Sequence, residues 1–112
     1  MQLTKNSIQQ IIDIAENLGW TVDTEEDNFL FTTYSPAEKC FCIELSSPDI
    51  ETLKKDLAEF IDGFDVSYET YLWLDEWGHG KNGAPYDMKE LYEDIEWCLD
   101  KTLELYRELF AN

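Results

Sequence analysis

The sequence predicts an α+β fold in which a three-stranded antiparallel meander is combined with helices, in the order α-β-β-β-α-α-α, with a long C-terminal helix. Residues 87–110 contain no glycine or proline, and their apolar residues recur at alternating steps of three and four. In residues 28–34 and 40–45 every second side chain belongs to one largely apolar face, as in half-buried strands. The links between these segments are too short for parallel crossovers, so neighbouring strands should pair antiparallel.

The first helix is expected over residues 7–18, and the three strands over residues 20–23, 28–34 and 40–45. Asn6 stands where the N-cap of this helix is expected. Alternation assigns one face of the sheet to the core. This inner face comprises Phe29, Phe31, Thr33, Phe41, Ile43 and Leu45.

The opposite face of the sheet is only half polar, because it carries Leu30, Tyr34, Cys40 and Cys42. A sheet face with this many apolar residues is usually covered in a folded protein. We therefore expect either the later helices or a second subunit to lie on it.

Two further helices are expected between the sheet and the C-terminal helix. The first should begin at Ser47-Pro48-Asp49, with Ser47 as its cap, and should end near Gly63. The second is expected over residues 66–77, with Asp65 as its cap, and it is dense in aromatic residues. Such a helix is apolar around most of its circumference, so it should be largely buried or belong to a protein interface.

The C-terminal helix separates apolar and acidic residues into two faces. The apolar stripe, which should meet the core, comprises Tyr92, Ile95, Leu99, Thr102, Tyr106 and Leu109. The acidic face comprises Glu90, Glu93, Glu96, Asp100, Glu104 and Glu108. The acidic turn 23–27 and the pair Asp75-Glu76 would extend this face if the fold places them on the same side. Residues 1–112 should form a single domain, with an αβββα layer over 1–63 and a helical hairpin over 65–112.

The charge of the chain restricts the partners that it can bind directly. With 25 acidic and 8 basic residues, the formal charge is −17, which should repel nucleic acid and anionic membranes and attract basic proteins. The first five elements follow the order of a double-stranded-RNA-binding domain, but the acidic charge excludes phosphate binding. The absence of a signal peptide and of a membrane-spanning run, with three cysteines that fit reduced thiols, predicts a cytoplasmic protein.

No group of residues in the sequence makes a convincing catalytic or metal-binding site. His79 with Asp75 and Glu76 would supply an incomplete set of ligands, and a solvated loop histidine is the simpler interpretation. Cys40 and Cys42 share a strand face without a second pair of ligands, so they are expected to pack as small apolar residues. We therefore predict a protein that is not an enzyme and that holds neither a cofactor nor a metal.

Two hypotheses for the function remain open. In the first, the acidic face binds a basic protein partner, and a nucleic-acid mimic is its most specific form. The contact residues would be Glu93, Glu96, Asp100, Glu104 and Glu108. In the second, the protein has a structural or assembly role and self-associates, for example as a homodimer, while its acidic residues serve only solubility. The contact residues would then be Tyr71, Trp73 and Trp77. A metal-dependent enzyme that uses His79 is the least favoured third hypothesis.

Two segments, residues 31–37 (FTTYSPA) and 72–85 (LWLDEWGHGKNGAP), are similar to a group of small acidic proteins of Firmicutes and their mobile elements. The resemblance extends over most of the chain. It implies a bacterial cytosol and a phage- or plasmid-like genetic neighbourhood, but it assigns no functional residue. Acidic DNA-mimic inhibitors of restriction or CRISPR nucleases occur in such neighbourhoods, which favours the mimic hypothesis by analogy.

Overall fold

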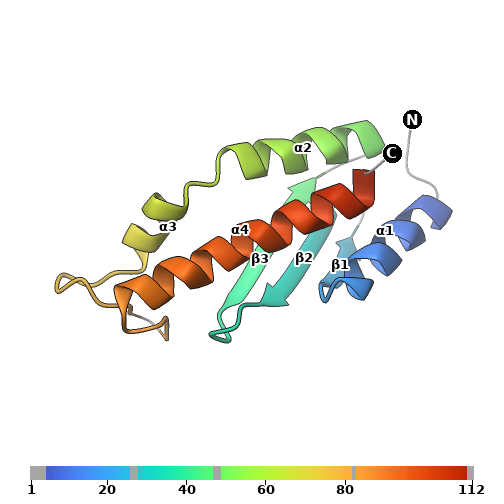
Figure 1. Cartoon of the computed structure of the whole chain (residues 1–112). Helices are drawn as coiled ribbons and strands as arrows, with labels where there is room; N and C mark the ends of the chain where they lie inside the picture. The colour runs from blue at the N-terminus through green and yellow to red at the C-terminus, as the bar shows by residue number, and fades with distance from the viewer. Residues whose placement is uncertain (1–4, 26–27, 47–48, 82, 111–112) are drawn as a thin grey trace.

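The computed structural model describes residues 5–25, 28–46, 49–81 and 83–110. Its elements, in chain order, are α1 (Lys5–Asn17), β1 (Thr21–Glu25), β2 (Asn28–Tyr34), β3 (Cys40–Ser46), α2 (Ile50–Asp62), α3 (Val66–Leu72) and α4 (Met88–Phe110). This order confirms the predicted α+β fold with its long C-terminal helix (Figure 1).

The three strands form an antiparallel sheet in the order β1-β2-β3. Phe31 at the centre of β2 lies opposite Val22 of β1 and Ile43 of β3. The predicted alternation is correct for the inner face, because Phe29, Phe31, Thr33, Ile43 and Leu45 are buried and Phe41 is half-buried. The register is fixed by this pattern, since a slip of one residue would turn the aromatic side chains of β2 toward water.

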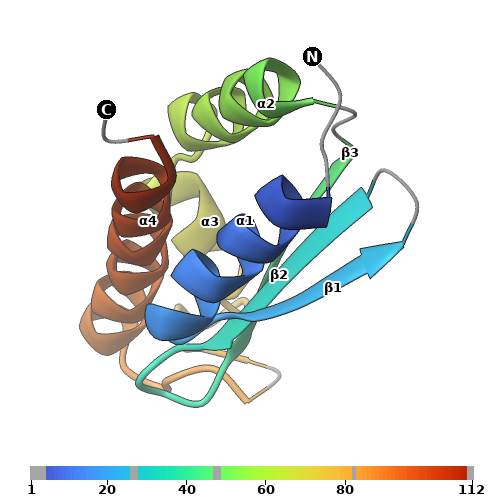
Figure 2. The ribbon, with the colours of Figure 1, turned by 90° about the vertical axis from the view of Figure 1, so that its right-hand side faces the viewer.

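Helices α1, α2 and α4 lie on the same face of the sheet, so the fold has one layer of helices and one layer of strands (Figure 2). The core lies between the two layers and draws residues from both ends of the chain. Its buried members are Ile11, Ala15, Trp20, Phe29, Phe31, Ile43, Leu45, Leu53, Leu57 and Leu105. Because Leu105 of α4 belongs to this core, the C-terminal helix is packed into the same layer as α1 and α2.

The outer face of the sheet is open, which corrects the expectation that the later helices cover it. Tyr34 is 65% exposed, Cys40 and Cys42 are exposed, and Leu30 is half-buried. Helices α1, α2 and α4 are all used to cover the inner face, where the aromatic side chains of β2 offer more apolar surface. Whether a second subunit covers the outer face stays a prediction.

Helix α4 buries a different stripe from the one predicted. Its buried residues are Leu91, Asp94, Ile95, Cys98, Thr102 and Leu105. Only Ile95 and Thr102 belong to the predicted stripe, and Tyr92 is exposed. At 100° per residue, the centre of the buried stripe is rotated by roughly 60° around the helix axis from the centre of the predicted stripe. The physical reason is that α4 packs against α1 as well as α2 and α3, and these flanking contacts decide which arc is enclosed.

Helix α3 ends at Leu72, five residues before its predicted end at Trp77. Beyond it the chain turns back on itself, with the amide of Lys81 donating to the carbonyl oxygen of Trp73 at 2.9 Å. The carboxylate of Asp75 holds this turn by accepting the amides of Trp77 at 2.8 Å and His79 at 3.0 Å. A side chain that binds backbone amides in this way competes with the helix, and here it ends α3.

Smaller differences occur at the ends of two other elements. Helix α1 already includes Lys5, so Asn6 lies inside the helix and not before it. The predicted cap of α2, Ser47, lies outside the described residues, and Asp49 caps this helix by accepting the amide of Thr52 at 2.7 Å. Gly63 ends α2 as predicted.

Candidate protein-binding surface

The outward face of α4 carries the acidic residues that the sequence singled out as partner-binding. Glu93, Glu96, Asp100 and Glu108 are exposed and Glu104 is half-buried. The row runs from Glu93 to Glu108 over about 22 Å of helix, at 1.5 Å per residue. The five residues lie on consecutive turns because they are spaced by three or four, as the sequence requires.

Two members of this acidic row have a basic neighbour. Glu104 pairs with Lys101 at 3.1 Å, and the same ammonium group donates to the carbonyl oxygen of Leu18. Glu93 lies 4.0 Å from Lys89, with both side chains largely in solvent, where an ion pair contributes little. No ion pair joins the other three acidic residues of the row to any described residue, so most of its negative charge is uncompensated.

The other acidic residues considered from the sequence do not lengthen this row. Asp23, Glu25 and Glu44 belong to the outer face of the sheet, where Asp23 and Glu44 flank Leu30 across the strands. That face points away from the helices (Figure 2). Residues 26–27 of the predicted acidic turn lie outside the described residues. Glu76 is exposed in the turn after α3 and does not belong to α4.

The three aromatic residues predicted for self-association have different surroundings. Tyr71 is 70% exposed and Trp77 is 76% exposed, so both side chains are open to a partner. Trp73 is half-buried, and the ammonium group of Lys39 lies 4.3 Å above its ring. This cation–π contact ties the end of α3 to the β2–β3 turn and leaves Trp73 less available than the other two.

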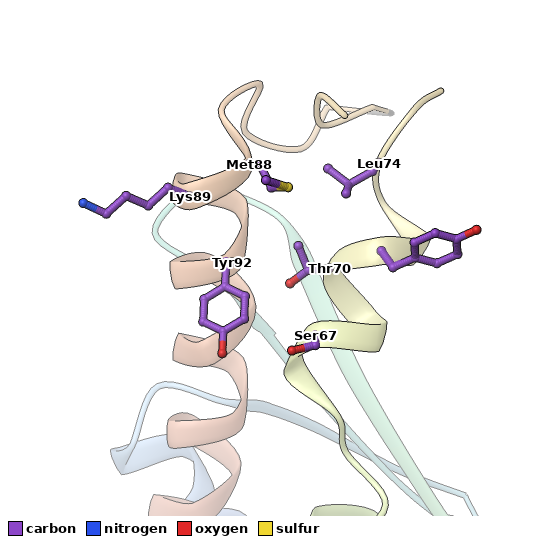
Figure 3. A pocket seen from close by; sticks show the side chains of 7 residues that line it. Ser67, Thr70, Leu74, Met88, Lys89 and Tyr92 are labelled. Carbon is purple, nitrogen blue, oxygen red and sulfur yellow. The ribbon is translucent and has the colours of Figure 1, made fainter. Parts of the chain in front are cut away.

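A groove of about 390 Å³ lies between α3 and the first turns of α4 (Figure 3). Its walls comprise Ser67, Thr70, Tyr71, Leu74, Met88, Lys89 and Tyr92. In Figure 3, Thr70 and Ser67 point from α3 toward α4, Met88 points toward Leu74, and the Lys89 side chain points away from the groove. Sequence reasoning missed this groove, because Met88 and Tyr92 become its wall only once α3 is placed beside α4.

The carboxylate of Asp94 is buried at the point where α4 meets the β2–β3 turn. The hydroxyl of Ser35 donates to it at 2.7 Å and the amide of Ala37 donates at 3.1 Å. The same hydroxyl accepts the amide of Lys39 at 3.1 Å. Asp94 therefore has a structural task, and it is set apart from the exposed acidic residues of the same helix.

The residues of the least favoured hypothesis, a metal-dependent enzyme, are engaged with their own loop. The ring of His79 stacks on that of Tyr86, with centroids 4.0 Å apart. The amides of His79 and Trp77 bind the Asp75 carboxylate and hold the pKa of Asp75 below its usual range. Glu76 points into solvent. Within the described ranges, no three histidine, cysteine or acidic side chains are grouped closely enough to hold a metal ion.

Cys40 and Cys42 differ from the expectation that they pack as small apolar residues. Cys40 and Cys42 are free thiols exposed on the outer sheet face, with their sulfur atoms 3.5 Å apart. The hydrogen bond between these two thiols raises the pKa of Cys40. Only Cys98 is buried, and this burial raises the pKa of its thiol to about 11.

Among the described residues, no helix combines the length and the apolar character that are needed to cross a bilayer. Scans of the chain against protein-family models, curated proteins and solved structures found no match, so its function has to be inferred from its own residues.

Proposed function

We propose that this protein is a non-catalytic binding module that docks the outward face of α4 on a basic protein partner. The observation that supports this most is the acidic row itself, of which Glu96, Asp100 and Glu108 are exposed and have no ion pair with a described residue. A face that served only solubility would be expected to mix charges of both signs. Residues 93–108 of α4 carry more acid than base, with Lys101 and Arg107 as their basic residues, and this surplus of one sign favours association with a surface of the opposite sign.

The spacing of the row supports a mimic of one nucleic-acid strand better than a mimic of a duplex. Five charges over about 22 Å leave four intervals of about 5–6 Å, whereas one DNA strand carries one charge per 3.4 Å and the duplex one per 1.7 Å. The acidic residues on the outer sheet face cannot supply a second strand, because they point to the opposite side of the molecule. The best-fitting partner is therefore a protein with a narrow basic groove.

The test compares two triple variants with the same change in net charge. One reverses Glu96, Asp100 and Glu108 to lysine on α4, and the matched control reverses Asp23, Glu25 and Glu44 on the outer sheet face. Partners captured from nuclease-treated bacterial lysate are identified and purified, and their affinity for each variant is measured by calorimetry.

We expect the α4 variant to lose the partner and the sheet variant to keep it. Affinity for the unmodified protein should fall steeply between low and moderate salt, because exposed charges are screened within about 10 Å at 0.1 M. Binding that survives both charge reversal on α4 and moderate salt would contradict the proposal.

The exposed aromatic side chains support self-association as a second candidate function. Tyr71 lines an apolar groove and Trp77 is exposed in the turn after α3. Contiguous exposed apolar surface of this kind often belongs to a protein interface. Light scattering of the unmodified protein and of a Tyr71→Ala/Trp77→Ala variant tests this. Self-association is supported if the unmodified protein is a dimer at every salt concentration and the variant is a monomer. It is contradicted if both proteins are monomers.

A further inference from the structure

We propose that the groove between α3 and α4 seats the apolar side chains of a cationic amphipathic helix carried by the basic partner. The inference rests on the proposed function and adds a chemical class to it. The acidic row attracts the partner at long range, and the groove selects a segment that combines basic and apolar residues.

The groove has the dimensions of a short helical contact. Its wall on the α3 side runs from Ser67 to Tyr71, roughly 6 Å along the helix, and continues to Leu74 in the turn after α3, while Met88 and Tyr92 line the α4 side one turn apart. Thr70 is almost fully buried at its floor, whereas Tyr71 and Met88 remain largely exposed at its edges. Two helical walls of about one turn each accommodate two apolar side chains spaced by three or four residues on a docked helix.

Charge at the two ends of the groove favours a cationic occupant. At one end, Glu96 follows Tyr92 by one helical turn and belongs to the acidic row. At the other end, a neighbouring hollow shares Tyr71 and Leu74 with the groove, and its charged lining residues are Asp75, Glu76 and Lys81, two acidic against one basic. The only basic residue on the groove wall is Lys89, whose ammonium group points away from the groove and toward Glu93.

The same charges argue against a second copy of this chain as the occupant. A second copy would bring its own formal charge of −17 to the acidic ends of the groove, and like charges placed together disfavour association. An apolar segment with lysine or arginine on its flanks has no such cost, because its basic residues meet Glu96 at one end and Glu76 at the other.

The test uses two synthetic peptides of the same leucine and lysine composition, each about five helical turns long. One places its leucines at alternating steps of three and four, and the other has the same residues in an order without this periodicity. Fluorescence anisotropy measures the affinity of each peptide for the unmodified protein, for a Tyr71→Ala/Met88→Ala variant and for Tyr34→Ala. Tyr34 serves as the control because it is equally exposed but lies on the outer sheet face.

We expect the amphipathic peptide to bind about tenfold more tightly than the permuted one. The Tyr71→Ala/Met88→Ala variant should lose this preference while Tyr34→Ala keeps it. Equal binding of both peptides overturns the groove inference but leaves the acidic-face proposal intact. A failure of both peptides to bind at low salt overturns both. The inference is also overturned if the Tyr71→Ala/Met88→Ala variant still prefers the amphipathic peptide. It is likewise overturned if light scattering shows that the unmodified protein is a dimer and this variant a monomer, because a second copy then occupies the groove.

Discussion

Replacing Asp94 by alanine should destabilise the fold far more than replacing any exposed acidic residue of α4. Asp94 is only 6% exposed, and its two carboxylate oxygens accept the hydroxyl of Ser35 and the amide of Ala37. Both donors belong to the turn between β2 and β3. The carboxylate therefore joins the N-terminal third of α4 to the sheet through the β2–β3 turn.

The expected cost follows from the two hydrogen bonds. A hydrogen bond to a charged group contributes about 1.5–3 kcal/mol, and alanine leaves both donors without their acceptor. Part of this loss is offset because a buried negative charge is removed from a protein that already carries a large excess of acid. We expect a net loss of about 3 kcal/mol for Asp94→Ala. Asp94→Asn keeps one carbonyl oxygen as an acceptor, so its cost should be about 1–2 kcal/mol.

Urea unfolding measures these differences, with Asp100→Ala as the matched control. Asp100 lies on the same helix, is exposed and has no ion pair with a described residue. Its removal should change the free energy of unfolding by no more than about 0.5 kcal/mol, and the urea dependence should stay the same in all variants. Equal midpoints for Asp94→Ala and Asp100→Ala would refute the role assigned to Asp94.

Three further predictions concern the cysteines and the loop before α4. In the folded protein at pH 8, iodoacetamide should modify Cys40 and Cys42 but reach Cys98 only after unfolding, as mass spectrometry of labelled peptides can show. Because the pKa of Cys98 is raised from 9.0 to about 11 in the folded state, its contribution to stability should be constant below pH 9 and fall as the pH rises toward 11, which urea midpoints across that range can test. Gly80→Ala should lower the free energy of unfolding by more than about 2 kcal/mol, because its added carbon would lie 1.8 Å from the carbonyl oxygen of Pro85. Gly78→Ala has open space around it and should cost about 1 kcal/mol from its positive φ alone. Thermal unfolding of the two variants measures this difference.

The fold could be predicted from the sequence because its strands and helices have unambiguous periodicity. Phe29 and Phe31 stand two residues apart on one face of β2, and the links on either side of β2 are too short for anything except antiparallel pairing. The end of α3 could not be predicted in the same way. Its aromatic residues continue a helical pattern to Trp77, and only the carboxylate of Asp75, which binds two backbone amides, diverts the chain into a turn.

The candidate surface was predicted only in part, for a related reason. The exposed row on α4 was identified correctly, because glutamates spaced by three or four must share a helix face. Asp94 could not be distinguished from its exposed neighbours, since its partners Ser35 and Ala37 lie far away in the sequence. The groove escaped prediction for the same reason: its two walls come from helices that are brought together only by the fold.

Added salt should stabilise the fold of this protein but weaken its binding to a partner. These opposite effects distinguish a loss of binding from unfolding. Part of the formal charge of −17 lies on α4, where like charges stand one turn apart and repel each other. Screening relieves this repulsion, so raising the salt concentration from about 50 mM to about 500 mM should raise the melting temperature by a few degrees. The same screening should weaken a complex that depends on the acidic row. A complex that dissociates while the melting temperature rises has lost its electrostatic attraction and not its fold. If the melting temperature falls instead, the self-repulsion of the acidic row is too weak to support the argument for recognition.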